Sequence, residues 1–305
     1  MQWIDSKTLN TFNQNQTNVH RLGTASSCWI ERYHEDYIIC HLPSSDPKLL
    51  ISELENKCAR LKLTINRIYS KLITNHSDLR GSPVIMLRNT HQPSSTQVKE
   101  WGLNYNIQFD AGYSHGFFMD QRMNRHHLRE ILKKKPHASV LNTFAYTCSF
   151  SVVSASCGND TISIDLLKSY LDKGRQNFQL NHILPDDHAF FSGDVREYLP
   201  RFMRQNRKFD VIILDPPTFS HAKKKGPFRI EKELPEMINL CLKLLSSTGQ
   251  LLISTNYTAL TTERLSDMVQ TISHKSETSF HFHEMPKLPD IPAAHMPSSL
   301  WINKI

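Results

Sequence analysis

The chain has 305 residues, of which only 10 are glycine and 6 are cysteine, and its formal net charge is +7. Glycine therefore makes up about 3% of the chain, against a usual share of about 7%. Neither GxGxxG nor GxxxxGK[ST] occurs, which argues against a dinucleotide oxidoreductase or a P-loop NTPase. The positive charge is compatible with a polyanionic partner such as nucleic acid, but it does not require one.

The cysteines are widely spaced, with no CxxC pair and no Cys/His cluster of zinc-binding spacing. This pattern predicts free thiols in a reducing compartment and no metal site. Residues 1–10 lack the apolar segment of a signal peptide, and no apolar run approaches the ~18 residues of a membrane span. We therefore expect a cytoplasmic protein without a membrane partner.

Residues 1–104 predict a small α+β domain. Residues 28–42 consist of two apolar stretches around a polar turn, which favours a hairpin. Residues 46–63 carry apolar side chains at helical spacing, with Pro47 at a position that suits a first helical turn. Two further strands are expected over residues 65–72 and 84–87.

Residues 105–305 predict a larger α/β domain. We expect a hairpin around Gly112, formed by residues 105–111 and 116–119, and then a basic helix over 122–135 that Pro136 ends. Strands are predicted over 139–143, 161–165, 189–192, 209–215, 250–255, 280–284 and 300–302, and helices over 149–156, 167–180, 195–204, 231–245 and 263–273. This alternation implies a mostly parallel sheet with helices on both faces.

Ligands of such sheets bind beyond the carboxyl ends of the strands, where this chain places acidic residues. Asp165 ends the second strand, and a carboxylate there can accept hydrogen bonds from both hydroxyls of a ribose. Asp194 follows the third strand, and its carboxylate could accept a hydrogen bond from the exocyclic amine of adenine. Each aspartate is equally suited to cap the helix that follows it, so neither identifies a site alone.

A more specific signal follows the fourth strand, where the chain reads Asp215, Pro216, Pro217, Thr218. The two prolines hold the backbone extended and remove two N–H donors. The remaining polar groups, the Asp215 carboxylate and the neighbouring carbonyls, form a row of acceptors. This acceptor row can accept hydrogen bonds from an amino group or from the edge of a base.

These residues carry a resemblance to a known family. Residues 215–220 (DPPTFS) and 140–151 (VLNTFAYTCSFS) resemble class I S-adenosylmethionine-dependent methyltransferases, and within them the bacterial group that methylates bases of large-subunit ribosomal RNA. Residues 116–125 (GFFMDQRMNR) and 177–181 (NFQLN) are similar to further phrases of that group. The likeness is good over residues 105–305 and weak over 20–104, and the group's N-terminal PUA domain is not expected in this chain.

The resemblance implies a seven-stranded, Rossmann-like methyltransferase domain, S-adenosyl-L-methionine as cofactor, S-adenosyl-L-homocysteine as product, and RNA, in first place ribosomal RNA, as partner. The cofactor-binding residues that it implies are Asp120, Gln121, Arg122, Asn142, Phe144, Tyr146, Thr147, Asp165 and Asp194. Asp215, Pro216 and Pro217 would orient the target base. Contacts to the substrate are expected from Thr218, Phe219, Tyr257, Lys223, Lys224 and Lys225, the rings by stacking and the lysines as part of a flexible basic flap.

Two departures from the family pattern leave alternatives open. Cys148 and Ser149 replace the paired glycines of the family's first loop, which leaves an inactive RNA-binding relic possible. Tyr257 stands where the cytosine-5 enzymes carry a nucleophilic cysteine, and a tyrosine does not readily replace a thiolate. The phrase DPPTFS without that cysteine is closer to the related guanine-N7 methyltransferases, so the resemblance implies N-methylation of guanine. A cytosine-5 enzyme that uses Cys148 and a protein or small-molecule methyltransferase remain alternatives.

Overall fold

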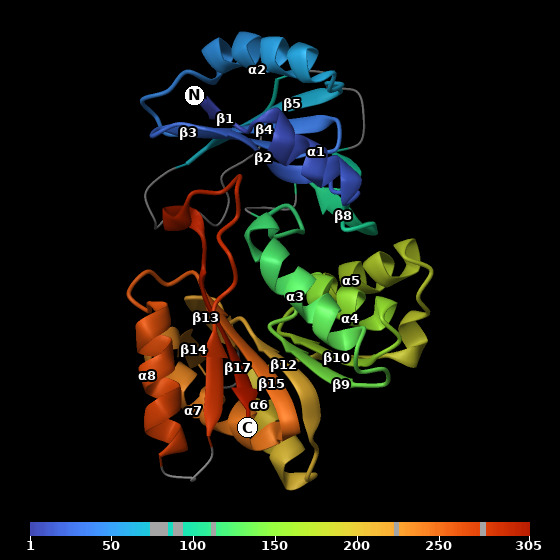
Figure 1. Cartoon of the computed structure of the whole chain (residues 1–305), viewed down its shortest axis with the longest axis vertical. Coiled ribbons are helices and arrows are strands. Elements are labelled where there is room, and N and C mark those ends of the chain that lie inside the picture. Colours follow the sequence, from blue (N-terminus) through green and yellow to red (C-terminus); the bar gives the residue numbers. More distant parts are fainter. Residues whose placement is uncertain (74–84, 88–93, 111–113, 223–225, 275–278) are drawn as a thin grey trace. The chain divides into compact units, whose positions relative to one another are not determined.

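The computed structural model describes residues 1–73, 85–87, 94–110, 114–222, 226–274 and 279–305, which divide into two compact units (Figure 1). The first consists of Met1–Arg122 together with Leu288–Ala293, and the second of Met123–Lys287 and Ala294–Ile305. The boundary thus lies after Arg122 rather than after residue 104. Within the described residues, no helix has both the length and the apolar character that crossing a membrane requires.

The first unit is built on a six-stranded sheet that two helices cover. The strands lie in the order β1 (Gln2–Trp3), β2 (Val19–Thr24), β3 (Cys28–Tyr33), β4 (Asp36–His41), β5 (Arg67–Leu72) and β6 (Ile85–Met86), and the helices are α1 (Ser6–Gln14) and α2 (Pro47–Leu61). The predicted hairpin and the helix after Asp46 are confirmed, and the Asp46 side chain caps α2 by accepting the Lys48 N–H at 2.9 Å. Helix α1 and strand β2 were not predicted.

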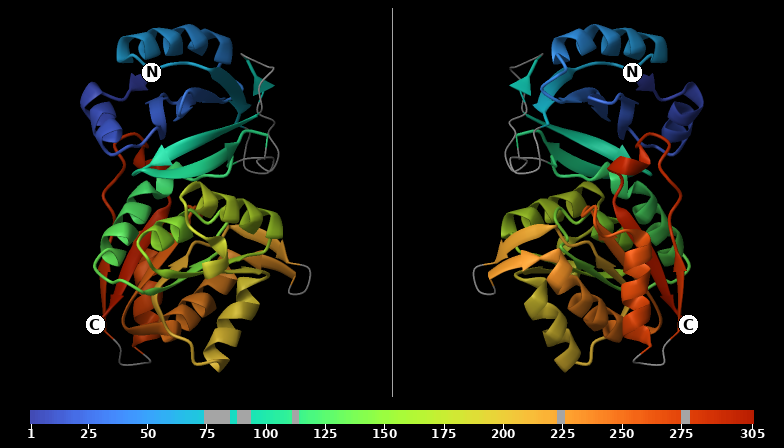
Figure 2. Two further views of the ribbon diagram at one scale, coloured as in Figure 1. Left: turned by 90° about the vertical axis from the view of Figure 1, so that its right-hand side faces the viewer. Right: turned by 90° about the vertical axis from the view of Figure 1, so that its left-hand side faces the viewer.

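The hairpin predicted around Gly112 is wrong, and Gly112 itself lies outside the described residues. The structure forms the hairpin earlier, between β7 (Ser95–Glu100) and β8 (Leu103–Gln108). Its turn residues Trp101 and Gly102 both have positive φ, 51° and 82°, as a two-residue turn of type I′ requires. The hairpin lies against the sheet face opposite α1 and α2 (Figure 2), where the Phe109 ring just beyond β8 packs on Tyr69 at 4.2 Å.

A buried ion cluster attaches residues 288–293 to the first unit. Arg122 Nη1 donates to Asp290 Oδ1 at 2.8 Å, and its Nε lies 3.6 Å from a carboxylate oxygen of Glu100. Burial alone would raise the pKa of Asp290, but the Arg122 guanidinium more than offsets this and holds that pKa below its usual value. Because these contacts join residues far apart in the sequence, sequence patterns did not reveal that this segment belongs to the first unit.

The second unit contains the predicted seven-stranded, mostly parallel sheet. Its strands lie in the order β11 (Ala189–Ser192), β10 (Asp160–Asp165), β9 (Ser139–Thr143), β12 (Phe209–Leu214), β15 (Leu245–Thr255), β17 (Ser298–Lys304) and β16 (Phe280–His283). The first five are parallel, and β17 is antiparallel to both neighbours. The α/β class and the Rossmann-like fold expected from the sequence are thus confirmed.

Helices cover both faces of this sheet. On one face lie α3 (Arg122–Leu132), α4 (Ser149–Ser156) and α5 (Lys168–Leu180), and on the other α6 (Val195–Arg204), α7 (Ile230–Leu244) and α8 (Thr262–Ser273) (Figure 1). Val211–Leu214 of the central strand β12 is buried on both sides, as its unbroken apolar run indicates. In the register, Thr143 pairs with Ile164 and with Leu214, and Leu214 pairs with Ile253. The carboxyl ends of these four strands are therefore level, and the predicted site residues follow them.

Candidate active site

Asp165 lies at the end of β10 with its carboxylate turned toward the loop after β9. Its Oδ2 accepts the Tyr146 N–H and its Oδ1 the Leu167 N–H, both at 2.9 Å. Helix α5 begins only at Lys168 and has Leu167 as its N-cap, so Asp165 is not the cap of that helix. A carboxylate offers about four acceptor positions, so acceptor capacity remains for a ligand. Burial raises the pKa of Asp165.

Asp194, in contrast, is the N-cap of α6. Its Oδ1 accepts the Arg196 N–H at 2.9 Å, and its Oδ2 accepts Nη2 of the same arginine at 2.7 Å. The capping role that the sequence left open is therefore present, while the adenine-binding role remains a prediction. Arg196 also donates to the Gly226 carbonyl at 3.2 Å and pairs with Glu233 at 3.4 Å. It thereby connects the end of β11 to two segments that follow the DPPTFS turn.

The loop between β9 and α4 adopts a glycine-like conformation without glycine. Phe144, Tyr146 and Cys148 have φ values of 53°, 49° and 63°, a region that costs an L-residue roughly 1–2 kcal/mol. Surrounding contacts hold the loop in place: Asn177 Nδ2 donates to the Thr147 carbonyl at 3.0 Å. Such strain persists only where the surroundings impose it, and it concentrates at functional sites.

Two residues beneath the loop support it from inside the fold. Asn142 is buried and donates to Ser151 Oγ of α4 at 2.9 Å, so it anchors that helix to the sheet. Arg125, which is 1% exposed, reaches Ser149 Oγ at 3.5 Å. The predicted site omitted Arg125 and Asn177, although each stands in a phrase that resembles the family, and that resemblance was the available signal.

Cys148 is completely buried, and its side chain packs against α5. A Cβ added to Gly174 would lie 2.5 Å from the Cys148 sulfur, so the glycine of α5 provides the space that this cysteine occupies. Burial raises the pKa of the Cys148 thiol to about 12. A thiol with this pKa is almost wholly protonated at neutral pH, and the thiolate is the nucleophilic form.

The resemblance implies methyl transfer to ribosomal RNA, and we expect Cys148→Ala to retain that transfer within about threefold of the wild type. The substitution removes a small buried side chain but no reactive group, and alanine tolerates the same packing against Gly174. Single-turnover transfer of radiolabelled methyl to ribosomal RNA measures the effect. A loss of a hundredfold or more, with unchanged thermal stability, would instead assign the thiol to catalysis.

The pairing of Cys148 with Gly174 also predicts a stability effect. Gly174→Ala should lower the free energy of unfolding by about 1–3 kcal/mol, the usual cost of overpacking, although alanine is the better helix former. Cys148→Gly in the same chain should restore most of the loss, because it removes the two atoms of Cys148 that lie closest to the new methyl group. Urea unfolding of the single and double variants tests this. Equal losses with and without Cys148→Gly would contradict the packing relation.

The acceptor row lies at the end of β12, next to the loop after β9. Asp215 is half-buried, Pro216 is buried, and Pro217 and Thr218 are exposed. Phe219 begins a hairpin of β13 (Phe219–Ala222) and β14 (Gly226–Arg229), where the sequence predicted a flexible flap. The three lysines predicted as its basic part, Lys223, Lys224 and Lys225, lie outside the described residues.

The hairpin is anchored at its second strand. Phe228 is 2% exposed, and its ring lies 5.9 Å from that of Phe144 in the loop after β9. The Arg196 guanidinium lies at the same distance from the Phe228 ring. The hairpin, Asp194 and the strained loop are thus connected through two side chains.

Tyr257 follows β15, the neighbour of β12 in the sheet. Its hydroxyl donates to Glu231 Oε1, in the first turn of α7, at 2.6 Å. No cysteine occupies this strand end, so the structure offers no thiol where the cytosine-5 enzymes carry one.

Three residues that were expected to border the cofactor belong to the first unit. Asp120 and Gln121 form part of a 3-10 helix (Met119–Gln121), and Arg122 joins the ion cluster described above. Their role beside the cofactor remains a prediction.

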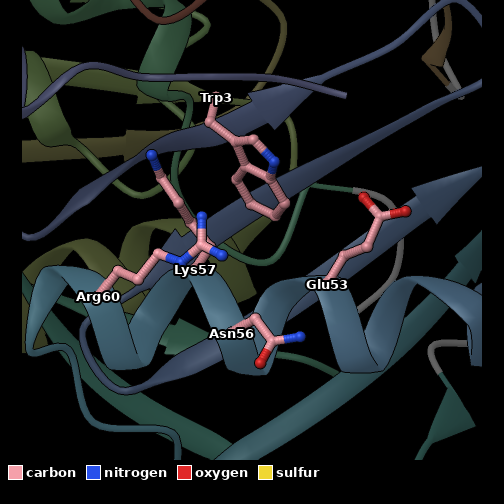
Figure 3. A pocket seen from close by; sticks show the side chains of 5 residues that line it. All are labelled: Trp3, Glu53, Asn56, Lys57 and Arg60. Carbon is pink, nitrogen blue, oxygen red and sulfur yellow. The ribbon is translucent and has the colours of Figure 1, made fainter.

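A hollow of about 270 Å³ in the first unit was not predicted (Figure 3). It is lined by Trp3, Glu53, Asn56, Lys57 and Arg60. A Cβ on Gly23 would lie 2.8 Å from the Trp3 ring, and the Lys57 ammonium lies 5.9 Å above that ring. These packing contacts account for the arrangement, and none of the residues belongs to the strand ends of the second unit.

The chain is similar to known methyltransferases in its sequence and in its fold. Residues 72–301 match the model of a family described as S-adenosylmethionine-dependent methyltransferase. The ribosomal RNA large subunit methyltransferase K/L of Psychrobacter cryohalolentis is 36% identical over 165 residues, which are 53% of this chain and 20% of that protein. The ribosomal RNA large subunit methyltransferase K of Neisseria meningitidis serogroup B is 35% identical over 161 residues, 52% of this chain and 45% of that protein.

The crystal structure of SMU.776, which is assigned as a methyltransferase, in complex with SAH superposes with a TM-score of 0.80 and 23% identity. The match covers 98% of this chain and 78% of that one. At this level of identity the likeness shows a shared fold. This chain spans less than half the length of either curated relative.

Proposed function

The chain belongs to the S-adenosylmethionine-dependent methyltransferase family, and we propose that it methylates a base of RNA, specifically a guanine of large-subunit ribosomal RNA, on nitrogen. The observation that carries this proposal is the acceptor row Asp215-Pro216-Pro217 at the end of β12, next to the strained loop. The names of the two relatives and the net charge of +7 support an RNA substrate.

The residues present fit the cofactor of this family. Asp165 has acceptor capacity for the ribose hydroxyls, and its half-buried position strengthens such bonds. The replacement of the family's glycine by Cys148 is accommodated, because the side chain fills the space at Gly174. When bound, the cofactor supplies an electrophilic methyl group. The chain's own contribution is to align the acceptor atom with it and to exclude water.

Nitrogen methylation suits this site better than methylation at cytosine C5. The cytosine reaction requires a thiolate that adds to the ring, and Cys148 is buried and protonated. A nitrogen lone pair, in contrast, attacks the methyl group directly once it is held in line. We also propose a cytoplasmic site of action, which the six free cysteines support.

Mass spectrometry of ribosomal RNA nucleosides from cells with and without the protein tests the proposal. We expect one methylated guanosine to disappear without the protein and to return with the wild-type gene. Purified protein should transfer radiolabelled methyl to the unmodified RNA. An unchanged nucleoside profile, or label that enters protein or small molecules instead, would refute an RNA substrate. Calorimetry without any binding of S-adenosyl-L-homocysteine would identify an inactive relic.

A further inference from the structure

We infer that Glu231 and Tyr257 form an acceptor pair that reads the two adjacent N–H donors on the Watson–Crick edge of the target guanine. This inference rests on the proposed function and identifies the residues that select the base. One short contact joins the two side chains: the Tyr257 hydroxyl donates a hydrogen bond of 2.6 Å to Glu231 Oε1.

The fold places this pair beside the acceptor row. Strands β12 and β15 are parallel neighbours, with Leu214 opposite Ile253. Asp215 and Tyr257 follow these two strands, so they leave the sheet at the same edge. Glu231 reaches Tyr257 from the first turn of α7, directly after the hairpin β13–β14. Tyr257 and Glu231 thus meet at the same sheet edge at which Asp215 leaves β12.

The hydrogen bond leaves the pair with acceptors alone. Tyr257 has one hydroxyl proton and donates it to Glu231, so the lone pairs of its oxygen are directed elsewhere. A tyrosine hydroxyl keeps its proton at neutral pH, and the hydrogen bond to Glu231 raises the pKa of Tyr257 further. Glu231 is exposed and Tyr257 half-buried, so both are accessible to a ligand.

An exposed carboxylate is unfavourable on a surface that meets a polyanion, unless it accepts from a base. Glutamate and aspartate in nucleic-acid interfaces contact base N–H groups for this reason. Guanine offers N1–H and the 2-amino group side by side, whereas adenine, cytosine and uracil each offer a single donor group on that edge. Two neighbouring acceptors, a carboxylate and a phenol oxygen, therefore match guanine among the four bases.

Binding to an RNA with a single altered base tests this inference independently of the methyl-transfer step. The probe is the ribosomal RNA fragment that the wild-type protein methylates, with either guanosine or inosine at the target position, since inosine lacks the 2-amino group. Affinities are measured by fluorescence anisotropy with the protein saturated by S-adenosyl-L-homocysteine. We expect the wild type to bind the guanosine RNA at least tenfold more tightly than the inosine RNA.

Glu231→Gln should weaken binding of the guanosine RNA about tenfold and bring the guanosine-to-inosine ratio close to one. Tyr257→Phe keeps the ring but removes the hydroxyl, and should lower the same ratio partially. Glu236→Gln, which neutralises another exposed glutamate of α7, is the matched control and should leave the ratio unchanged. A ratio in Glu231→Gln equal to that of the wild type would overturn the inference.

The two proposals fail in different ways. If the wild type methylates adenosine or cytidine in ribosomal RNA, Glu231 and Tyr257 do not select guanine. The proposal that the protein methylates RNA is then kept. If the wild type methylates no RNA, the proposed function itself is wrong.

Discussion

Asp165→Asn should reduce the affinity for S-adenosyl-L-homocysteine at least tenfold, and methyl transfer at subsaturating cofactor in parallel. A charge-assisted hydrogen bond contributes about 1.5–3 kcal/mol, and each ~1.4 kcal/mol corresponds to a factor of ten. The carboxylate holds the Tyr146 and Leu167 N–H groups, so the substitution also loosens the loop that would surround the cofactor. Isothermal titration calorimetry measures the affinity directly.

Asp160→Asn is the matched control, since Asp160 is an exposed aspartate at the opposite end of the same strand. It should bind S-adenosyl-L-homocysteine as the wild type does. Wild-type affinity in Asp165→Asn would show that the ribose is held elsewhere.

A pH titration keeps this prediction testable if the variant is poorly folded. Burial raises the pKa of Asp165 above that of an ordinary aspartate, so its carboxylate becomes protonated at a higher pH as the solution is acidified. Protonation removes the charge that strengthens a hydroxyl hydrogen bond. The wild-type affinity should therefore be complete above the raised pKa and decline as the pH falls through it.

Asp215→Asn should lower kcat about a hundredfold and leave the affinity for S-adenosyl-L-homocysteine within twofold of the wild type. Asp215 continues a buried strand into two prolines, which restrict its backbone, and its side chain is half-buried at the sheet edge. An amide in its place presents donors as well as an acceptor, and misplacement of the base by about 1 Å can cost a hundredfold in rate. Steady-state kinetics with saturating ribosomal RNA measure kcat.

For this variant the control is Asp267→Asn, an exposed aspartate of α8, which should leave both quantities unchanged. A parallel loss of cofactor affinity in Asp215→Asn would place this carboxylate at the cofactor instead of the base. Activity within threefold of the wild type would remove it from the site.

The comparison of sequence and structure shows which features local patterns encode. Residues 139–143, 149–156, 189–192 and 195–204 form the predicted elements with unchanged bounds. Helix 195–204 has a strong apolar period and begins after its N-cap Asp194, whereas helix 149–156 is buried on nearly all sides. The misplaced hairpin illustrates the limit. Gly112 looked like the stronger turn signal, but two-residue turns depend on φ at both positions, and Trp101 adopts the left-handed region beside Gly102.

Part of the candidate site could likewise be predicted from the sequence, and part could not. The order of strand ends follows from the alternation of elements, so Asp165, Asp215 and Tyr257 could be placed at one sheet edge from the sequence. The sequence could not show which of the two aspartates caps a helix, because Asp165 and Asp194 both follow a strand and precede a helix. Only Asp194 is followed by an arginine that folds back onto its carboxylate, and only Asp165 meets the backbone of the previous loop.

The sequence by itself determined the family, the sheet and the glycine shortage of the loop after β9. Local periodicity and short phrases carry that information, because each is set by residues within a few positions of one another. The tertiary structure alone decided that Gly174 accommodates Cys148, that Asp290 holds residues 288–293 on the first unit, and that Glu231 meets Tyr257. These partners lie tens to more than a hundred residues apart, so they become neighbours only when the whole chain folds.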